Sequence, residues 1–80
     1  MTVSRFETGG FVMHGVPVAT GAYSAWFDAG GRLVECERTR DGNRIIPAGR
    51  SVPASHVHVR AALTRKGQAV AARIRENLPV

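Results

Sequence analysis

Residues 28–44, "DAGGRLVECERTRDGNR", decide the fold of this chain, because they hold a strand-forming segment between two tight turns. Asp28 opens the first turn, and the two glycines after Ala29 can adopt the positive φ angles of a short hairpin connection. Asp41 and Gly42 provide the same chemistry at the second turn. We therefore predict a strand over residues 32–40 that lies between two antiparallel neighbours.

The predicted strand over residues 32–40 is half buried and heavily charged. Successive side chains of a strand point to opposite faces, so the segment divides into two sets. One face carries Arg32, Val34, Cys36, Arg38 and Arg40, and the other carries Leu33, Glu35, Glu37 and Thr39.

Three further segments have strand character. Residues 11–18, "FVMHGVPV", form an apolar, β-branched run, and residues 22–28, "AYSAWFD", follow it after a turn-like segment. Residues 44–47, "RIIP", form a short strand that ends at Pro47, because proline cannot donate to a sheet ladder. Together with residues 32–40, these segments predict an antiparallel meander.

The aromatic residues of segment 22–28 alternate between its faces. Tyr23, Ala25 and Phe27 share one face, whereas Trp26 lies on the other. One aromatic ring is therefore expected on the exposed side of the sheet.

Residues 56–63, "HVHVRAAL", allow two interpretations. Valines that alternate with polar side chains favour a strand, which we expect after a loop over residues 48–55. The alternative is a helix that begins at Ser51 or Pro53, since alanines and a proline near the first turn suit a helix as well. We favour the strand.

A C-terminal helix is predicted over residues 65–78, with Thr64 as its N-cap and Pro79 closing it. Its apolar stripe consists of Val70, Ala71, Ile74 and Leu78. Gly67 costs up to about 1 kcal/mol in helix propensity, and bases near a helix start oppose the helix dipole. Two local rules broken at one place indicate close packing or function there.

The predicted fold class is α+β: a small antiparallel meander of three to five strands with one C-terminal helix packed on the sheet. We expect a single domain over residues 1–80, because a chain of 80 residues cannot support two cores. Cys36 is the only cysteine, so an intrachain disulfide is excluded. Stability must come from packing, a partner or oligomerisation, and a homodimer is compatible with this.

Composition favours a globular protein in the cytoplasm. Hydrophobic residues make up 44% of the chain and charged residues 21%. No apolar run approaches the roughly 18 residues of a membrane span, so we expect no membrane partner. The N-terminal segment "MTVSRFETGG" lacks the order of a secretory signal.

The net charge of +5 is concentrated in the C-terminal half. Residues 1–43 carry four bases and five acids, whereas residues 44–80 carry seven bases and one acid. Clustered bases favour an anionic partner such as DNA or RNA, because they release condensed counterions on meeting phosphate, although a solvated basic face gives the same pattern. The candidate nucleic-acid-binding residues are His56, His58, Arg60, Arg65, Lys66, Arg73 and Arg75.

The sequence contains only weak signals for a metal site or a catalytic site. His56 and His58 on one strand face would supply only two ligands, with His14 or Cys36 as further ones, and we expect neither a metal nor another cofactor. A nearby arginine can lower the pKa of a thiol, but a lone cysteine in a strand is more often a small core residue. Because no nucleophile or paired-carboxylate motif is present, we do not expect an enzyme.

The segments "GRLVECERTRDGNR" and "VRAALTRKGQAVAARI" within residues 32–76 resemble the wing and the following helix of winged helix-turn-helix repressors of the MarR type. The resemblance implies DNA binding and a regulatory role. In that family a recognition helix precedes the wing, whereas residues 11–28 here are predicted as strands. The positions that carry the resemblance are Leu33, Val34, Glu35, Asp41, Arg44, Leu63, Thr64 and Gly67.

The second functional hypothesis is a protein-binding role. A small chain with an edge strand and a charged meander has the size of adaptor or inhibitor proteins that cover a surface on a larger assembly, such as a mobile-element protein that blocks a nucleic-acid-processing machine. Glu35 and Glu37 on one strand face would then form a surface separate from the basic helix.

Overall fold

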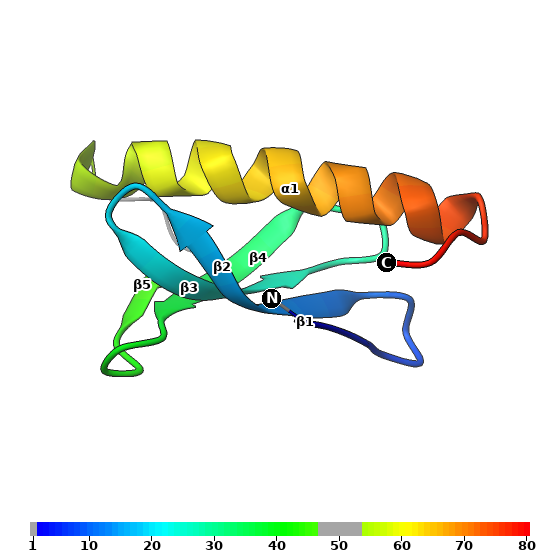
Figure 1. Ribbon diagram of the computed structural model, residues 1–80, viewed down its shortest axis with the longest axis horizontal. Helices are drawn as coiled ribbons and strands as arrows, with labels where there is room; N and C mark the ends of the chain where they lie inside the picture. Colours follow the sequence, from blue (N-terminus) through cyan, green and yellow to red (C-terminus); the bar gives the residue numbers. More distant parts are fainter. Residues whose placement is uncertain (1, 47–53) are drawn as a thin grey trace.

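The computed structural model describes residues 2–46 and 54–80, which form a five-stranded antiparallel sheet with one long helix across one of its faces (Figure 1). The strands lie in the sheet in chain order, so the sheet is a simple meander. The α+β fold class is confirmed. The elements are β1 (Thr2–Arg5), β2 (Phe11–Val18), β3 (Gly21–Phe27), β4 (Leu33–Arg38), β5 (Arg44–Ile46), the 3-10 helix η1 (Ala54–His56) and α1 (Val57–Arg75).

Both predicted turns are present. At the first, the Asp28 carboxylate accepts hydrogen bonds from the backbone N–H groups of Gly30 and Arg32, each at 2.9 Å. Gly31 has a φ angle of 83°, and a Cβ atom there would lie 3.0 Å from the Cβ of Ala71 in α1. This turn therefore needs glycine both for its backbone conformation and for its contact with the helix.

The predicted strand over residues 56–63 is wrong, because α1 begins at Val57 and runs without a break through Thr64 to Arg75. As a helix, Val59 and Leu63 stand four residues apart and both are fully buried against the sheet. The 19 residues of α1 extend about 28 Å, whereas the predicted 14-residue helix would cover only about 21 Å of the sheet. Burial of the whole apolar sheet face outweighs the strand preference of the valines.

Strand β1 is the one strand of the sheet that the sequence patterns did not predict. It is four residues long, lies at the edge of the sheet and pairs with β2 from Thr2 opposite His14 to Arg5 opposite Phe11. Only Val3 of this strand packs against the core. Because β1 has a single core-facing apolar side chain, its sequence does not show the alternation of apolar and polar residues by which a strand is predicted.

The face assignment of the predicted strand 32–40 is correct for Cys36, which is fully buried, and for Glu35 and Glu37, which lie on the opposite face. It is wrong for Val34, which is 40% exposed, while Leu33 packs against the core instead. The cause is an irregularity in the β3–β4 pairing, where Trp26 pairs with Glu35 but the next residue pairs with Leu33. A register shift of this kind moves a side chain to the other face.

The helix also ends earlier than predicted. Asn77 has a φ angle of 61°, and the N–H of Leu78 donates to the carbonyl of Arg73 at 2.8 Å. This is a Schellman arrangement with asparagine in the left-handed position. Leu78 therefore lies beyond the helix and is 44% exposed, so it is not part of the apolar stripe.

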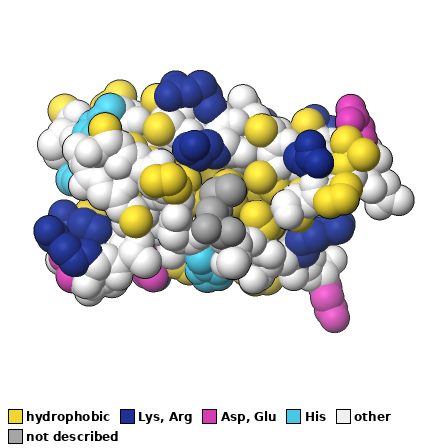
Figure 2. Space-filling view, viewed as in Figure 1, with side chains coloured by type: hydrophobic (Ala, Val, Ile, Leu, Met, Phe, Trp, Pro, Cys, Tyr) yellow, Lys and Arg dark blue, Asp and Glu magenta, His cyan; other side chains and the backbone are white. Residues whose placement is uncertain are grey.

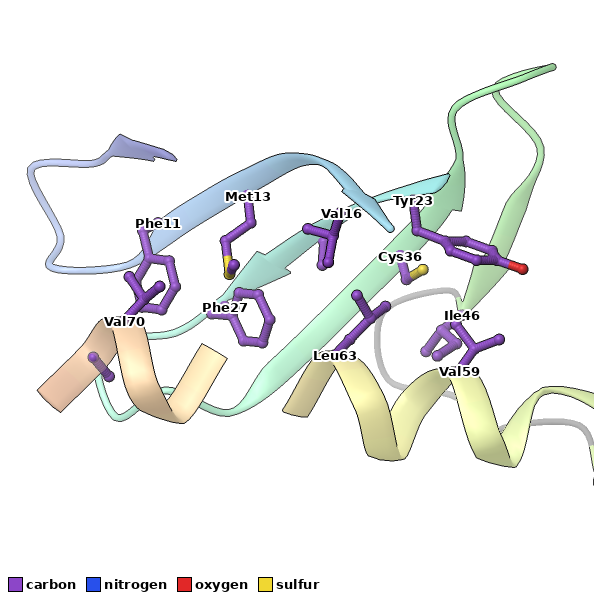
Figure 3. Close-up of a cluster of buried hydrophobic side chains, with 12 residues drawn as sticks. Phe11, Met13, Val16, Tyr23, Phe27, Cys36, Ile46, Val59, Leu63 and Val70 are labelled. Atoms are coloured by element: carbon purple, nitrogen blue, oxygen red, sulfur yellow. The ribbon is translucent and has the colours of Figure 1, made fainter. Parts of the chain in front are cut away.

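The core lies between α1 and the sheet. Phe11, Phe27 and Val70 meet toward one end of it, while Ile46 and Val59 lie toward the other (Figure 3). The rings of Phe11 and Phe27 stack with centroids 5.0 Å apart. Gly67 allows the helix to approach this pair, because a Cβ atom there would lie 2.1 Å from Cε2 of Phe27. The sequence predicted that either close packing or function explains Gly67, and the contact with Phe27 shows that close packing does.

Candidate nucleic-acid interface

Helix α1 carries the five predicted bases on its exposed surface. Its apolar row faces the sheet, so most of the remaining circumference is exposed to solvent. The helix contains no acidic residue, and its first acidic neighbour is Glu76 after the last turn. The exposed bases of α1 are Arg60, Arg65, Lys66, Arg73 and Arg75.

None of these five side chains forms an ion pair within residues 2–46 and 54–80. The three ion pairs of that part of the chain all belong to Arg38 or Arg44 in the sheet. Arg73 has one intramolecular partner, since its Nε donates to the carbonyl oxygen of Pro79. The positive charge of α1 is thus left available for an external anion.

The structure separates the two predicted histidine contributors. His56 is the residue before α1, and its ring contacts the hydroxyl of Ser55 at 3.1 Å. His58 lies in the first turn, where its Nε2 is 3.3 Å from Oγ1 of Thr20. Residues two apart on a helix point to different sides, so these rings do not form the two-ligand face that a strand would have given them.

The contact between His58 and Thr20 joins the helix to the β2–β3 hairpin. Thr20 Oγ1 also lies 2.7 Å from the hydroxyl of Tyr23, whose ring is buried in the core. The tip of this hairpin comes up beside the first turns of α1 (Figure 1). Sequence patterns could not find this contact, because its partners are 38 residues apart.

The sheet face opposite α1 has a different character. Arg44 reaches from β5 across β4, where its guanidinium nitrogens lie 3.2 Å from Glu35 and 3.7 Å from Glu37. Its guanidinium carbon also lies 6.0 Å from the centre of the Trp26 ring. The acidic strand face and the tryptophan therefore lie on the side of the molecule away from the helical bases.

Three ionisable groups in β4 and the β4–β5 turn have shifted pKa values, namely Cys36, Arg38 and Asp41. Burial raises the pKa of the Cys36 thiol to about 11, and the charge of Glu37 acts in the same direction. The arginines near Cys36 in sequence thus do not lower its pKa. In the β4–β5 turn, hydrogen bonds from the Arg38 guanidinium and then from the backbone of Asn43 lower the pKa of Asp41.

Residues 2–46 and 54–80 contain no pocket and no group of three or more histidine, cysteine, aspartate or glutamate side chains placed to hold a metal ion. Nor does any helix there have the length and apolar character needed to span a membrane. The exposed basic surface of α1 is the most pronounced chemical feature of the described residues.

The chain matches no known protein family, no curated protein and no solved structure. The local resemblance to a winged-helix wing therefore stays a prediction, and it involves β4, β5 and the helix that follows. The residues before it form β2 and β3, at the place where that family has its recognition helix.

Proposed function

We propose that this protein is a non-enzymatic nucleic-acid-binding protein, acting as a regulator in the cytoplasm, and that α1 makes the contact. The observation that carries the proposal is the set of five exposed bases on one helix that holds no acid and makes no ion pair within the described residues. Such a surface gains affinity by releasing the counterions of a phosphate backbone. Phosphate contacts then dominate over base contacts.

Fluorescence anisotropy with labelled duplex and single-stranded DNA at several salt concentrations tests this proposal. If four of the five bases meet phosphates of a duplex, the logarithm of the binding constant falls with the logarithm of salt concentration with a slope of about −3.6. The double variant Lys66→Gln/Arg73→Gln should reduce the size of this slope by about 2. Absence of binding at low salt would refute the proposal.

The matched control is Arg5→Gln/Arg40→Gln, which removes the same charge from exposed positions outside α1. Its slope should equal that of the parent protein, because these arginines lie in β1 and in the β4–β5 turn. A control slope that falls as much as that of the helix variant would mean that only net charge matters. The contact face would then have to be placed elsewhere.

The sheet face opposite α1, which no element of the described residues covers, favours a second candidate function, binding to a protein assembly. Trp26 is only half buried there, and Glu35 and Glu37 give that face a sign opposite to that of α1. The test is capture of a partner protein from nuclease-treated lysate. This candidate is supported if the Arg65→Gln/Lys66→Gln variant still captures the partner and the Glu37→Lys variant does not. The reverse pattern would exclude the sheet face as the contact.

A further inference from the structure

The bases of α1 are divided between the two flanks of the helix. Lys66 and Arg73 are seven residues, or two turns, apart and lie on one flank. Arg60 and Arg75 lie on the other flank, and Arg65 lies between the flanks on the side opposite the sheet. The Lys and Arg side chains accordingly occupy separate places along the helix layer, with apolar and uncharged side chains between them (Figure 2).

The row of α1 that points away from the sheet, which we call the crown, is built mainly from small side chains. It runs through Ala61, Arg65 and Ala69, all of which are exposed. A helix with its side chains is about 10 to 12 Å across, and the major groove of B-form DNA is about 12 Å wide. Alanines on the crown keep the helix narrow where it would meet the floor of a groove.

From this arrangement we propose that α1 enters the major groove of double-stranded DNA, an inference that rests on the proposed function and names its substrate. The two flanks face the two phosphate strands that border the groove, so each strand meets two bases of α1. Arg65 on the crown faces the base edges, where an arginine can donate two hydrogen bonds to one guanine. The exposed amide of Gln68 lies beside the crown and can bond to adenine, donating to N7 and accepting from the N6 amino group.

The β2–β3 hairpin limits which part of the helix can enter. Because Thr20 contacts His58, the hairpin tip occupies one side of the first turns. The free part of α1 therefore begins near Ala61 and extends to Arg75, about 22 Å of helix. It holds four of the five bases, whereas Arg60 lies at its border.

The described residues favour a duplex over a single strand. Proteins that hold single strands stack the bases on exposed aromatic rings beside a basic groove. Helix α1 contains no Phe, Tyr or Trp, Trp26 lies on the opposite face of the sheet, and the exposed ring of Phe6 belongs to the β1–β2 turn rather than to the helix. A-form RNA duplexes are disfavoured as well, because their major groove is too narrow for side chains to read.

Duplexes of one length and sequence that differ in their grooves test the inference by anisotropy. Glucosylated hydroxymethylcytosine fills the major groove without changing the number of phosphates, and it should weaken binding at least 10-fold. Netropsin, which occupies the minor groove of an A·T-rich duplex, should leave the affinity within 2-fold. A duplex RNA should bind at least 10-fold more weakly than the duplex DNA.

Equal affinities for plain DNA, glucosylated DNA and duplex RNA would overturn the groove inference but leave the proposed function standing, because phosphate binding would still be seen. Loss of binding to all of them at low salt would refute the proposed function itself. Competition by netropsin would move the contact to the minor groove and would also overturn the inference.

A substitution on the crown gives an independent test. Ala69→Trp should weaken duplex binding at least 10-fold by obstructing the groove, and should strengthen single-strand binding by adding a ring for stacking. Ala22→Trp, at an exposed position on the far sheet face, is the matched control and should change neither affinity. Circular dichroism and thermal unfolding establish that both variants fold. Unchanged duplex affinity in folded Ala69→Trp would overturn the inference.

Discussion

Gly67 is the residue on which the packing of α1 against the sheet depends most closely. It is buried in the middle of the helix, where glycine costs about 1 kcal/mol relative to alanine. The nearest atoms to its missing side chain all belong to the ring of Phe27. The helix gives up intrinsic propensity at this position so that the ring can lie against its backbone.

Gly67→Ala should lower the free energy of unfolding by about 1 to 2 kcal/mol, because overpacking against Phe27 outweighs the gain in helix propensity. Urea unfolding followed by far-ultraviolet circular dichroism measures this. Gln68→Ala, at the exposed neighbouring position, is the matched control and should change stability by less than about 0.5 kcal/mol. A Gly67→Ala protein as stable as its parent would contradict the contact.

Strand alternation identified the core residues of β3 but only part of those of β4. Tyr23, Ala25 and Phe27 are buried as the alternation predicts, because β3 has an uninterrupted pattern up to its last residue. In β4 the irregular pairing near Leu33 places Val34 in solvent. A bulge depends on how two strands meet, so the sequence of one strand does not reveal it.

At the scale of whole elements, local signals succeeded where turns determine the chain path. Alternation and the glycine-containing turns predicted the bounds of β2, β3 and β4 and the start of β5 within two residues. The predicted end of β5 at Pro47 and most of the predicted loop over residues 48–55 lie outside the described residues. The segment before α1 had no comparable signal, and alternating valines gave the wrong element there. Of those valines, Val59 is buried but Val57 is 54% exposed. The alternation therefore had no structural role.

The identity of the exposed residue at position 61 tests the helical assignment. In a helix the stability should fall in the order alanine, valine, glycine, with losses of about 0.5 kcal/mol for Ala61→Val and about 1 kcal/mol for Ala61→Gly. In a strand valine would be the most stable of the three. Urea unfolding of the three proteins gives the order. The same substitutions at exposed Ala22 in β3 are the matched set, and valine should be equal or better there.

At the scale of the molecule, the charge asymmetry along the chain becomes a separation between layers. The basic C-terminal half contributes α1, and the acidic strand face lies on the other side of the sheet with Arg44 across it. The asymmetry and the list of bases could be predicted from the sequence. The places of Arg60 and Ala61 in the division into flanks and crown could not, because they require that residues 57–64 belong to the helix.

Trp26, the only tryptophan of the chain, reports on the sheet face alone, so its fluorescence tests this separation of layers. If duplex DNA occupies α1, saturation with duplex should leave both the emission of Trp26 and its quenching by acrylamide unchanged. Arg44→Gln should increase the quenching in free and bound protein alike, because it removes the guanidinium group 6.0 Å from the ring. Protection of Trp26 by a single strand or a duplex would instead place nucleic acid on the sheet, where bases can stack on an exposed ring. The bases of α1 would then be left without a role in binding.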